Sequence, residues 1–480
     1  MKHYSLEDVL DLADSDSTIT DIQINGNIKY ITVSKNIPVN PICPICGSRL
    51  HSKGRFSRHP NNQILQDGYS VDLTVIGRRW KCSNPKCAYT ATDQFDFLEK
   101  RKRTSKIIVF QILMAFKDIN MSCSQIAQKF HVSDTYVHQL FMRYIDLPRK
   151  KLTEFICIDE VYLNLDPYCK YALVIMDFLS GVILDIIQSR RQQYTESYFL
   201  SIPKTERDQV KAICCDMYDP YINYTTKYFH NAVAVTDSFH VLQWLLRLIR
   251  NYINSVKKRY QARDRKLLKE KNEYIKSDQK SVKDSKEVYI LKKANWVLLL
   301  NPNKWEYHPP HYNYKLQKPM DTYSWESEFL ALDENFQTIR NLKDLYEDFN
   351  EKFVNNLEGA SKRLDELIEI YDNSNIQLFN DFSSLLKRYH DSIVNSFTYV
   401  AAQNISGAAL RRLSNGPLES FNNIPSGLRS QSHGVQNFQY TRNRILWAVR
   451  DDASIKAVPY TIKQIQTEGR KRSTYKKKNE

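Results

Sequence analysis

The sequence predicts a mixed α/β protein of several domains, and three observations support this fold class. Apolar runs typical of β-strands alternate with helical segments between residues 155 and 240. Two pairs of closely spaced cysteines lie in the first 100 residues. Residues 246–404 instead carry Leu, Ile, Tyr and Trp at helical spacing within long charged segments. Because a chain of 480 residues exceeds what one simple core supports, we expect these regions to fold separately.

The composition is that of a folded, basic protein. Hydrophobic residues make up 42% of the chain, and 69 basic against 54 acidic residues give a formal net charge of +15. This excess favours a polyanionic partner, with nucleic acid ahead of a membrane surface, although many soluble proteins are mildly basic. No apolar run approaches the roughly 20 residues that span a bilayer, and the N-terminus has no signal-peptide core. We therefore expect a cytoplasmic protein without membrane contact, whose cysteines are thiols or metal ligands.

The first 100 residues read as short strands and turns around the two cysteine pairs. Cys43 and Cys46 lie in PICPICG, and Cys82 and Cys87 lie in KCSNPKC, 36 residues further on. Each pair lies on a tight turn, so all four thiolates can point at one ion. Four thiolates close a tetrahedral zinc site, which is structural because it leaves no open position. The spacing predicts a zinc ribbon, with unrelated buried thiols as the alternative.

A pattern of two short helices follows within residues 107–145. In NMSCSQIAQKFHVSDTYVHQLFMRY, Ser122 or Ser124 can cap a first helix and Ser133 a second. The expected inward residues are Ile126, Ala127, Phe130, Val137, Leu140 and Phe141. The pattern predicts a helix-turn-helix that binds DNA, although any helical hairpin would share it. The residues expected to contact DNA are Ser133, Thr135, Tyr136 and His138.

Residues 155–240 predict a mixed sheet. Three strand runs, FICIDEVYLNL, KYALVIMDF and GVILDIIQS, form a meander, and two further strands, VKAICCDMY and NAVAVTDSFHV, alternate with helices. Asp159 and Asp216 each follow four largely apolar residues. A buried carboxylate costs several kcal/mol unless it is compensated, and a bound divalent cation is one compensation. Asp177 and Asp237 also end apolar strands, so strand context alone does not select the metal ligands.

A third carboxylate comes from LSNGPLESFNN, which has the features of a helix start. Pro417 suits the first helical position and Glu419 lies in the first turn. Taken alone, Glu419 would merely favour the helix dipole.

The motifs quoted above, ending in CCDMYDPYI, VTDSFHV and SNGPLESFNN, occur in the order shown by the ISL-three family of bacterial insertion-sequence transposases. The sequence resembles that family over nearly its whole length. The resemblance implies an RNase H-like core with a catalytic DDE triad on Asp159, Asp216 and Glu419. The 57 residues between the two aspartates and the 203 before the glutamate fit a core that an insertion interrupts. Asp237 and His240 match a family phrase and are expected to support the triad.

The resemblance and the patterns together predict six regions. They are a zinc-binding domain (1–100), a helix-turn-helix domain (101–152), the first part of the catalytic core (153–245), a mainly helical insertion (246–404), the last part of the core with Glu419 (405–455) and a basic tail (456–480). Many relatives carry a lysine-rich helix after the glutamate, and this chain departs from that pattern. In its place, phosphate contacts or a plain surface role are expected for Arg429, His433, Arg442 and Arg444.

The predicted function is transposition of an insertion sequence. The protein would bind the terminal inverted repeats of its element as a homo-oligomer on double-stranded DNA, near the bacterial nucleoid. It would cut the ends and join them to target DNA with Mg²⁺ or Mn²⁺ on the triad, and Zn²⁺ would be structural. The alternatives are a structure-specific RNase H-like nuclease or resolvase, a non-enzymatic DNA-binding regulator, and a transposase copy that has lost activity.

Overall fold

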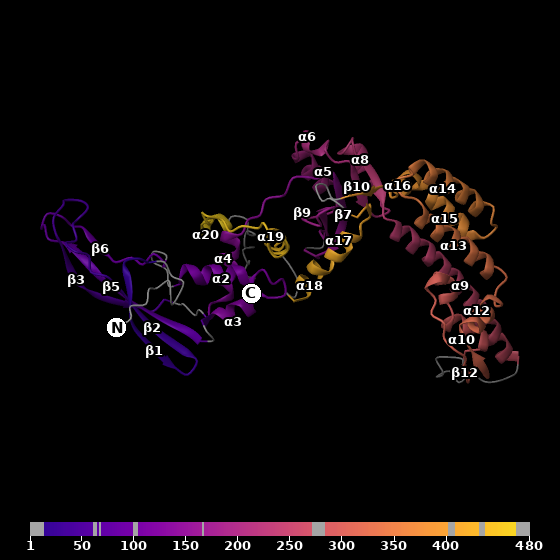
Figure 1. Ribbon diagram of the computed structural model, residues 1–480, viewed down its shortest axis with the longest axis horizontal. Coiled ribbons are helices and arrows are strands. Elements are labelled where there is room, and N and C mark those ends of the chain that lie inside the picture. The colour runs from indigo at the N-terminus through magenta and orange to yellow at the C-terminus, as the bar shows by residue number, and fades with distance from the viewer. Residues whose placement is uncertain are drawn as a thin grey trace, which may run out of the picture. The chain divides into compact units, whose positions relative to one another are not determined.

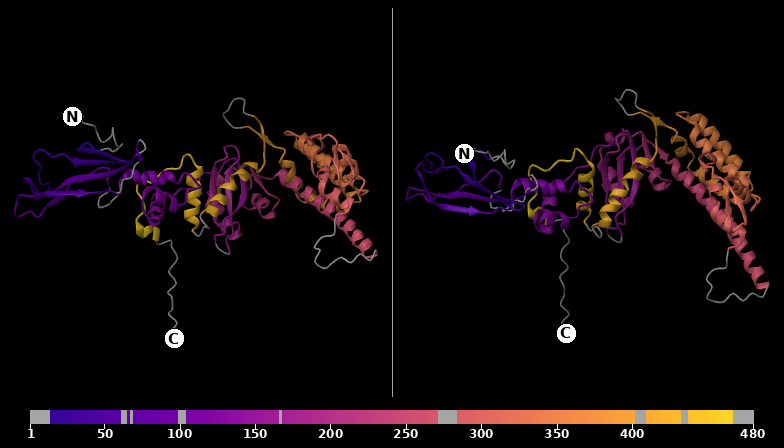
Figure 2. Two further views of the ribbon diagram at one scale, coloured as in Figure 1. Left: turned by 90° about the horizontal axis from the view of Figure 1, so that it is seen from below. Right: turned by 60° about the horizontal axis from the view of Figure 1, so that its bottom comes forward.

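The computed structural model divides the chain into two compact units, residues 1–148 with 424–480 and residues 149–423. Their elements can be followed in Figures 1 and 2. The structure describes residues 14–60, 65–66, 69–98, 104–165, 168–270, 284–401, 409–431 and 437–466. None of the helices in these ranges combines the length and the hydrophobicity that a membrane crossing requires.

The first unit begins with a six-stranded sheet. Its strands are β1 (Ser17–Asn25), β2 (Ile28–Lys35), β3 (Leu50–Arg58), β4 (Leu65–Gln66), β5 (Tyr69–Cys82) and β6 (Thr90–Thr92). The order is β1-β2-β5-β3, and β4 and β6 also pair with β5. The β2–β5 pair is parallel, and the other pairs are antiparallel. Strand β3 begins and strand β5 ends next to the cysteine pairs, with Leu50 opposite Cys82.

A helical group completes the first unit. Its helices are α2 (Lys106–Ala115), α3 (Cys123–Phe130), α4 (Asp134–Tyr144), α18 (Asn423–Gln431), α19 (Phe438–Val449) and α20 (Ile462–Gln466). The expected caps are confirmed, because Ser122 accepts from the Gln125 amide and Ser133 from the Tyr136 amide. The expected inward faces of α3 and α4 are also buried. Helix α19 joins this group, where the Trp447 indole donates to the Leu113 carbonyl at 2.9 Å.

The second unit contains a five-stranded mixed sheet, as the sequence predicted. The strands are β7 (Phe155–Tyr162), β8 (Tyr171–Asp177), β9 (Ile183–Ile187), β10 (Ala212–Cys215) and β11 (Val233–Thr236). Their order is β11-β10-β7-β8-β9. Strands β7, β8 and β9 form the antiparallel meander, and β10 and β11 run parallel to β7. The carboxyl ends of β7, β10 and β11 therefore lie at one edge.

One face of this sheet is covered by α5 (Gln192–Ser201), α6 (Lys204–Arg207), α7 (Asp219–Ile222) and α8 (Tyr224–Lys227). Their aromatic side chains, Phe199, Tyr221, Tyr224 and Tyr228, pack in one cluster with Ile156 and Ile158 of β7 and Ile213 and Cys215 of β10. Since side chains alternate along a strand, Cys157 and Asp159 of β7 point to the opposite face, as do Cys214 and Asp216 at the end of β10.

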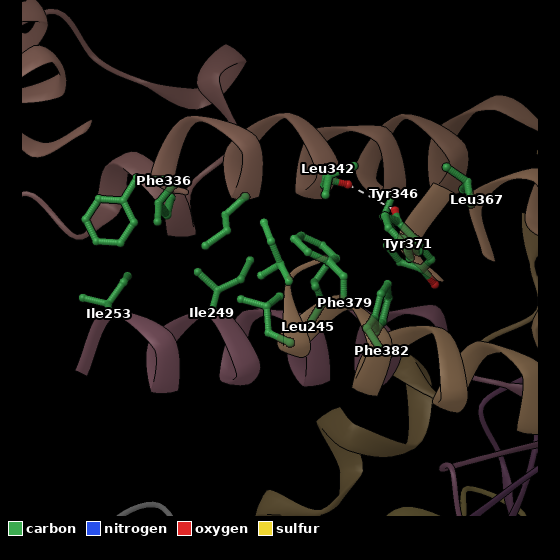
Figure 3. Close-up of a cluster of buried hydrophobic side chains, with 14 of the residues drawn as sticks. Leu245, Ile249, Ile253, Phe336, Leu342, Tyr346, Leu367, Tyr371, Phe379 and Phe382 are labelled. Carbon is green, nitrogen blue, oxygen red and sulfur yellow. Dashed lines mark hydrogen bonds between the residues drawn. The ribbon is translucent and has the colours of Figure 1, made fainter. Parts of the chain in front are cut away.

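Helix α9 (Ser238–Glu270) leaves the end of β11 and continues into the helical insertion (Figures 1 and 2). The further elements are α10 (Lys286–Lys293), α11 (Trp296–Leu299), η1 (Pro302–Lys304), β12 (His311–Asn313), β13 (Lys318–Met320), α12 (Thr322–Leu330), α13 (Phe336–Lys352), α14 (Leu357–Asp372), α15 (Gln377–Arg388) and α16 (His390–Asn395). Figure 3 shows apolar side chains of α9 meeting those of α13, α14 and α15 in a common core. The short pair β14 (Tyr399–Val400) and β15 (Arg411–Arg412) then leads to α17 (Gly416–Phe421).

Two expected domain boundaries differ from this arrangement. The boundary at residue 246 falls inside α9, which is one continuous helix from the sheet to the insertion. Residues from 424 onward group with the first 148 residues, because α19 packs on the helical group of the first unit. The second unit, which contains Glu419, ends at Asn423. The basic residues from 467 to 480 lie outside the described part of the chain.

Candidate active site

Asp159 and Asp216 are neighbours because their strands pair in parallel. Cys157 of β7 is the partner of Cys214 of β10, and each aspartate lies two residues beyond its cysteine. Both side chains therefore emerge on the same face of the sheet, away from the aromatic helices. The side chain of the adjacent Glu160 points to the face of the sheet that carries the aromatic helices. There it pairs with Arg190 and accepts a hydrogen bond from the Tyr221 hydroxyl at 2.5 Å.

Asp237 follows β11 and is 2% exposed. Its Oδ1 accepts from the Phe239 amide at 2.8 Å, in the first turn of α9. Its Oδ2 accepts from the Asn415 amide at 2.6 Å, directly before α17. One buried carboxylate thus connects the starts of the two helices that carry His240 and Glu419. The Asn415 side chain also donates to the Ile158 carbonyl of β7 at 3.4 Å.

Glu419 and Asp216 meet at His240. The His240 Nε2 atom lies 2.9 Å from Asp216 Oδ1 and 3.1 Å from Glu419 Oε1. Contact with Asp216 raises the pKa of His240 to about 9, although burial opposes the shift. His240 is therefore a cation at neutral pH and neutralises part of the charge of the two carboxylates.

Asp159 is partly buried, and both of its carboxylate oxygens accept hydrogen bonds. Its Oδ1 accepts from the Glu160 amide at 2.7 Å, and its Oδ2 accepts from the Asn422 amide group at 2.6 Å. Burial and then the charge of Asp216 raise the pKa of Asp159 to about 6, against the effect of these hydrogen bonds. Burial contributes most to this raised pKa and the nearby Asp216 carboxylate contributes second, and a bound cation would offset both effects.

The structure separates these acids from Asp177, which sequence context could not do. Asp177 pairs with Ile156 near the start of β7, whereas Asp159 lies three residues further along that strand and pairs with Val174. Its carboxylate accepts from the Thr153 hydroxyl at 2.7 Å and from the Ser180 amide at 2.9 Å, which fixes the turn after β8. Asp177 therefore has a local structural role.

The four cysteines of the first unit come together as the sequence predicted. Their sulfur atoms all lie within 4.8 Å of one another, and all nine cysteines of the chain are free thiols. Cys43 Sγ is 3.8 Å from Cys87 Sγ, and Cys46 Sγ is 3.4 Å from Cys82 Sγ. Within the described ranges, no other group of three or more His, Cys, Asp or Glu ligand atoms is as close together. The carboxylates of Asp159, Asp216 and Glu419 are therefore farther apart than the four sulfur atoms.

The residues expected to contact DNA from α4 differ in exposure. Ser133 and Thr135 are exposed at the start of the helix. Tyr136 is half-buried, and its hydroxyl lies 2.8 Å from the Thr104 hydroxyl. His138 packs on the Tyr440 ring of α19 with 4.6 Å between ring centroids, and burial lowers its pKa. The first turn of α4 is thus more accessible than the expected contacts further along.

The expected phosphate contact or surface role of Arg442 does not fit the structure, because only 8% of this residue is exposed. Its guanidinium donates to the Leu147 carbonyl at 2.8 Å and to Asn443 Oδ1 at 3.1 Å. Arg444 is 1% exposed and donates to the carbonyl groups of Phe116, Asp118 and Met121. These guanidiniums hold α19 in place, so neither a phosphate contact nor a surface role fits them. Arg429 is half-buried on α18, and His433 lies outside the described residues.

Two residues of the site were not predicted as members of it, although both lie in the quoted phrase SNGPLESFNN. Asn415 accounts for the position of α17, and Asn422 holds Asp159. An asparagine three residues after Glu419 lies on the same side of a helix, which was the available signal for Asn422. No comparable signal marked the Asn415 amide, since its contact with Asp237 spans 178 residues.

The comparisons with known proteins agree with this site. A family model for ISL-three transposases, described as "Transposase", matches residues 156–445, which is more than half of the chain. The matched range contains Asp159, Asp216, His240 and Glu419. No curated protein sequence matches the chain. The family match covers more than half of the chain, and its range includes the carboxylates that lie together beside the mixed sheet. We conclude that the chain belongs to the ISL-three family of insertion-sequence transposases.

Proposed function

We propose that this transposase cuts and joins DNA with a DDE triad formed by Asp159, Asp216 and Glu419. The observation that carries the proposal is their convergence from β7, β10 and α17, with His240 Nε2 within 3.1 Å of two of them. The three side chains are separated by 57 and 203 residues in the sequence. The pKa of Asp159 is raised to about 6 by burial and by the neighbouring Asp216 carboxylate, and a bound divalent cation would stabilise its charged form.

We propose further that the five-stranded sheet is an RNase H-like catalytic core. Numbered along the chain, its strands have the spatial order 3-2-1-4-5, with an antiparallel meander followed by two parallel strands. This order brings the ends of the first and fourth strands side by side. The helical insertion lies between the second aspartate and the glutamate, as the family resemblance implies.

The donor set fits a hard divalent cation such as Mg²⁺ or Mn²⁺. All three ligands would be carboxylate oxygens, which these ions prefer, and they lie at the edge of a buried sheet. The bound cations would activate the attacking water or 3′-hydroxyl and stabilise the charge that develops on the phosphate. Asn422 and the Glu160 amide orient Asp159, while Asp237 fixes the helices that carry His240 and Glu419.

We propose that the first unit recognises the inverted repeats at the ends of the element. Zinc bonded to four thiolates at about 2.3 Å places neighbouring sulfur atoms about 3.8 Å apart, and the cysteine cluster has this size. The helices α3 and α4 have the caps, length and buried faces of a helix-turn-helix. In this arrangement, the exposed Ser133 and Thr135 would contact DNA. End recognition by several copies would bring two element ends together.

Substrate choice and one substitution test this function. Asp216→Ala should abolish metal-dependent cleavage of inverted-repeat ends and leave end binding largely intact, because the first unit is unchanged. Wild-type cleavage by the Asp216→Ala protein would show that the triad is wrong. Preferential cleavage of four-way junctions over element ends would instead favour a structure-specific nuclease with the same triad.

A further inference from the structure

A stripe of exposed polar residues runs along helix α9 from the candidate active site. Beyond His240, the stripe consists of Gln243, Arg247, Arg250, Lys258 and Arg265, all of which are exposed. Their successive spacings of four, three, eight and seven residues keep them on one side of an α-helix, which has 3.6 residues per turn. The stripe contains four basic residues and no acidic residue. We refer to it as the α9 basic stripe.

The opposite side of α9 is buried in the protein core. Leu245, Ile249 and Ile253 are at most 5% exposed and pack against the helices of the insertion, as Figure 3 shows. The helix therefore cannot rotate without exposing this apolar face, and the basic stripe has a fixed direction. The insertion thus stabilises a long, rigid helix that starts at the catalytic carboxylates and presents positive charge to solvent.

A hollow of about 370 Å³ lies at the start of the stripe. Its lining combines residues of the candidate active site with residues of the stripe: Asp216, Met217, His240, Gln243, Trp244, Arg247 and Arg250. The Arg247 guanidinium lies over the Trp244 ring, 4.0 Å from its centroid. This stacking restricts the Arg247 side chain and reduces the entropy lost when it binds an anion.

The charges of the stripe are not balanced within the protein. No carboxylate among the described residues forms an ion pair with Arg247, Arg250, Lys258 or Arg265. Other basic residues of α9 behave differently, because Arg259 pairs with Asp333 and Arg263 with Glu287. The four cations of the stripe thus differ from Arg259 and Arg263, whose charges are balanced by carboxylates of the protein.

We infer that the α9 basic stripe binds the sugar–phosphate backbone of the DNA strand that is cut, and positions the scissile phosphate at the carboxylates. The inference rests on the proposed function for the identity of the polyanion. Arg247 lies about 10 Å beyond His240 along the helix, which corresponds to about three nucleotides of B-form rise. Arg247 and Arg250 are therefore positioning residues for phosphates two to four nucleotides from the cleavage site, and Lys258 and Arg265 extend the contact.

Salt dependence of DNA binding tests the contact without any chemistry. A labelled duplex carrying one end of the element is titrated with the full chain in EDTA at several salt concentrations. The variant Arg247→Gln/Arg250→Gln should lower the slope of log affinity against log salt by about 1.8, since each phosphate contact contributes about 0.9. The control Lys362→Gln/Arg363→Gln removes the same charge from exposed pairs with Glu358 and Glu366 on α14 and should keep the wild-type slope.

Two further experiments distinguish positioning of the DNA backbone by Arg247 and Arg250 from an indirect structural effect of their substitution. Arg247→Lys/Arg250→Lys should restore the slope, because the charges return. In cleavage assays, one phosphate two to four nucleotides from the element boundary is replaced by a neutral methylphosphonate. This replacement should slow cleavage by the wild type at least tenfold. It should not slow cleavage by the Arg247→Gln/Arg250→Gln variant any further. Equal slopes for the glutamine variant and the wild type, or additive losses at every methylphosphonate position, would overturn the inference. A lowered slope without cleavage under any metal condition would support the stripe and reject the DDE function.

Discussion

Asp237 offers the sharpest single test of how the site is assembled, although it is not one of the three proposed metal ligands. Its carboxylate accepts from the Phe239 amide at the start of α9 and from the Asn415 amide before α17. These helices carry His240 and Glu419. Replacing Asp237 with alanine should therefore loosen the two helices relative to each other and displace Glu419 from Asp216.

The expected loss of stability follows from the two hydrogen bonds. Each hydrogen bond to a charged group contributes about 1.5–3 kcal/mol, and an unpaired buried amide costs about 1–3 kcal/mol. The Asn415 amide would lose its partner in a residue that is fully buried. Removing a buried carboxylate also relieves its desolvation cost, so we expect a net loss of about 2–4 kcal/mol for the unit that contains it.

Asp177→Ala is a matched control for this variant. Asp177 is also buried, also ends an apolar strand, and accepts from the Ser180 amide and the Thr153 hydroxyl. Urea unfolding should therefore show comparable losses of stability for the two variants. Cleavage of element ends, measured well below the unfolding transition, should fall at least tenfold for Asp237→Ala and change little for Asp177→Ala.

The two rates decide between positioning and general stability. Equal cleavage rates for the two variants would refute the claim that Asp237 positions the catalytic helices. Wild-type activity of Asp237→Ala would refute it as well. A selective loss in Asp237→Ala with unchanged DNA affinity would support it, since binding is assigned to other residues.

Three further predictions concern the metals and the first unit. Cys46→Ser should lower the zinc content from one equivalent to near zero, as measured by atomic absorption, and should reduce the melting temperature of the first unit. An unchanged zinc content would contradict the cysteine site. Arg444→Ala should destabilise the first unit by about 3 kcal/mol, because three carbonyl groups lose a buried charged donor, and an unchanged urea midpoint would contradict this. Protons compete with the cation for Asp159, whose pKa is raised to about 6 mainly by burial, so cleavage at limiting Mg²⁺ should decline as the pH falls through 6. A rate that stays constant across that range would count against Asp159 as a ligand.

Local patterns predicted much of the architecture because they reflect local physics. The apolar runs predicted the strands β7 to β11, and Ser122 and Ser133 marked two helix starts that the structure confirms. The cysteine spacing predicted a cluster that is present. The strands and helix starts depend on residues that are close in the sequence. The cysteine cluster depends on four residues that all bind zinc through a thiolate.

Long-range packing was not predictable from the same patterns. The buried Arg442 and Arg444 were expected to be accessible, because arginine is usually exposed and nothing local shows that α19 packs on the helical group of the first unit. The distinction between Asp177 and Asp237 depends on which end of the sheet each occupies, and strand pairing decides that. The choice of Glu419 needed the family resemblance, since a glutamate in a first helical turn is common.

Cleavage of a labelled duplex that carries the element's own ends tests the central claim most directly. The reaction would be run with Mg²⁺, with EDTA, and with Asp159→Asn protein, which keeps the size of the side chain but removes its charge. The account predicts a nick at the element boundary that requires the metal and disappears in the variant, while end binding persists. Tight binding of the ends without cleavage under any metal condition, or full cleavage by the Asp159→Asn protein, would contradict it.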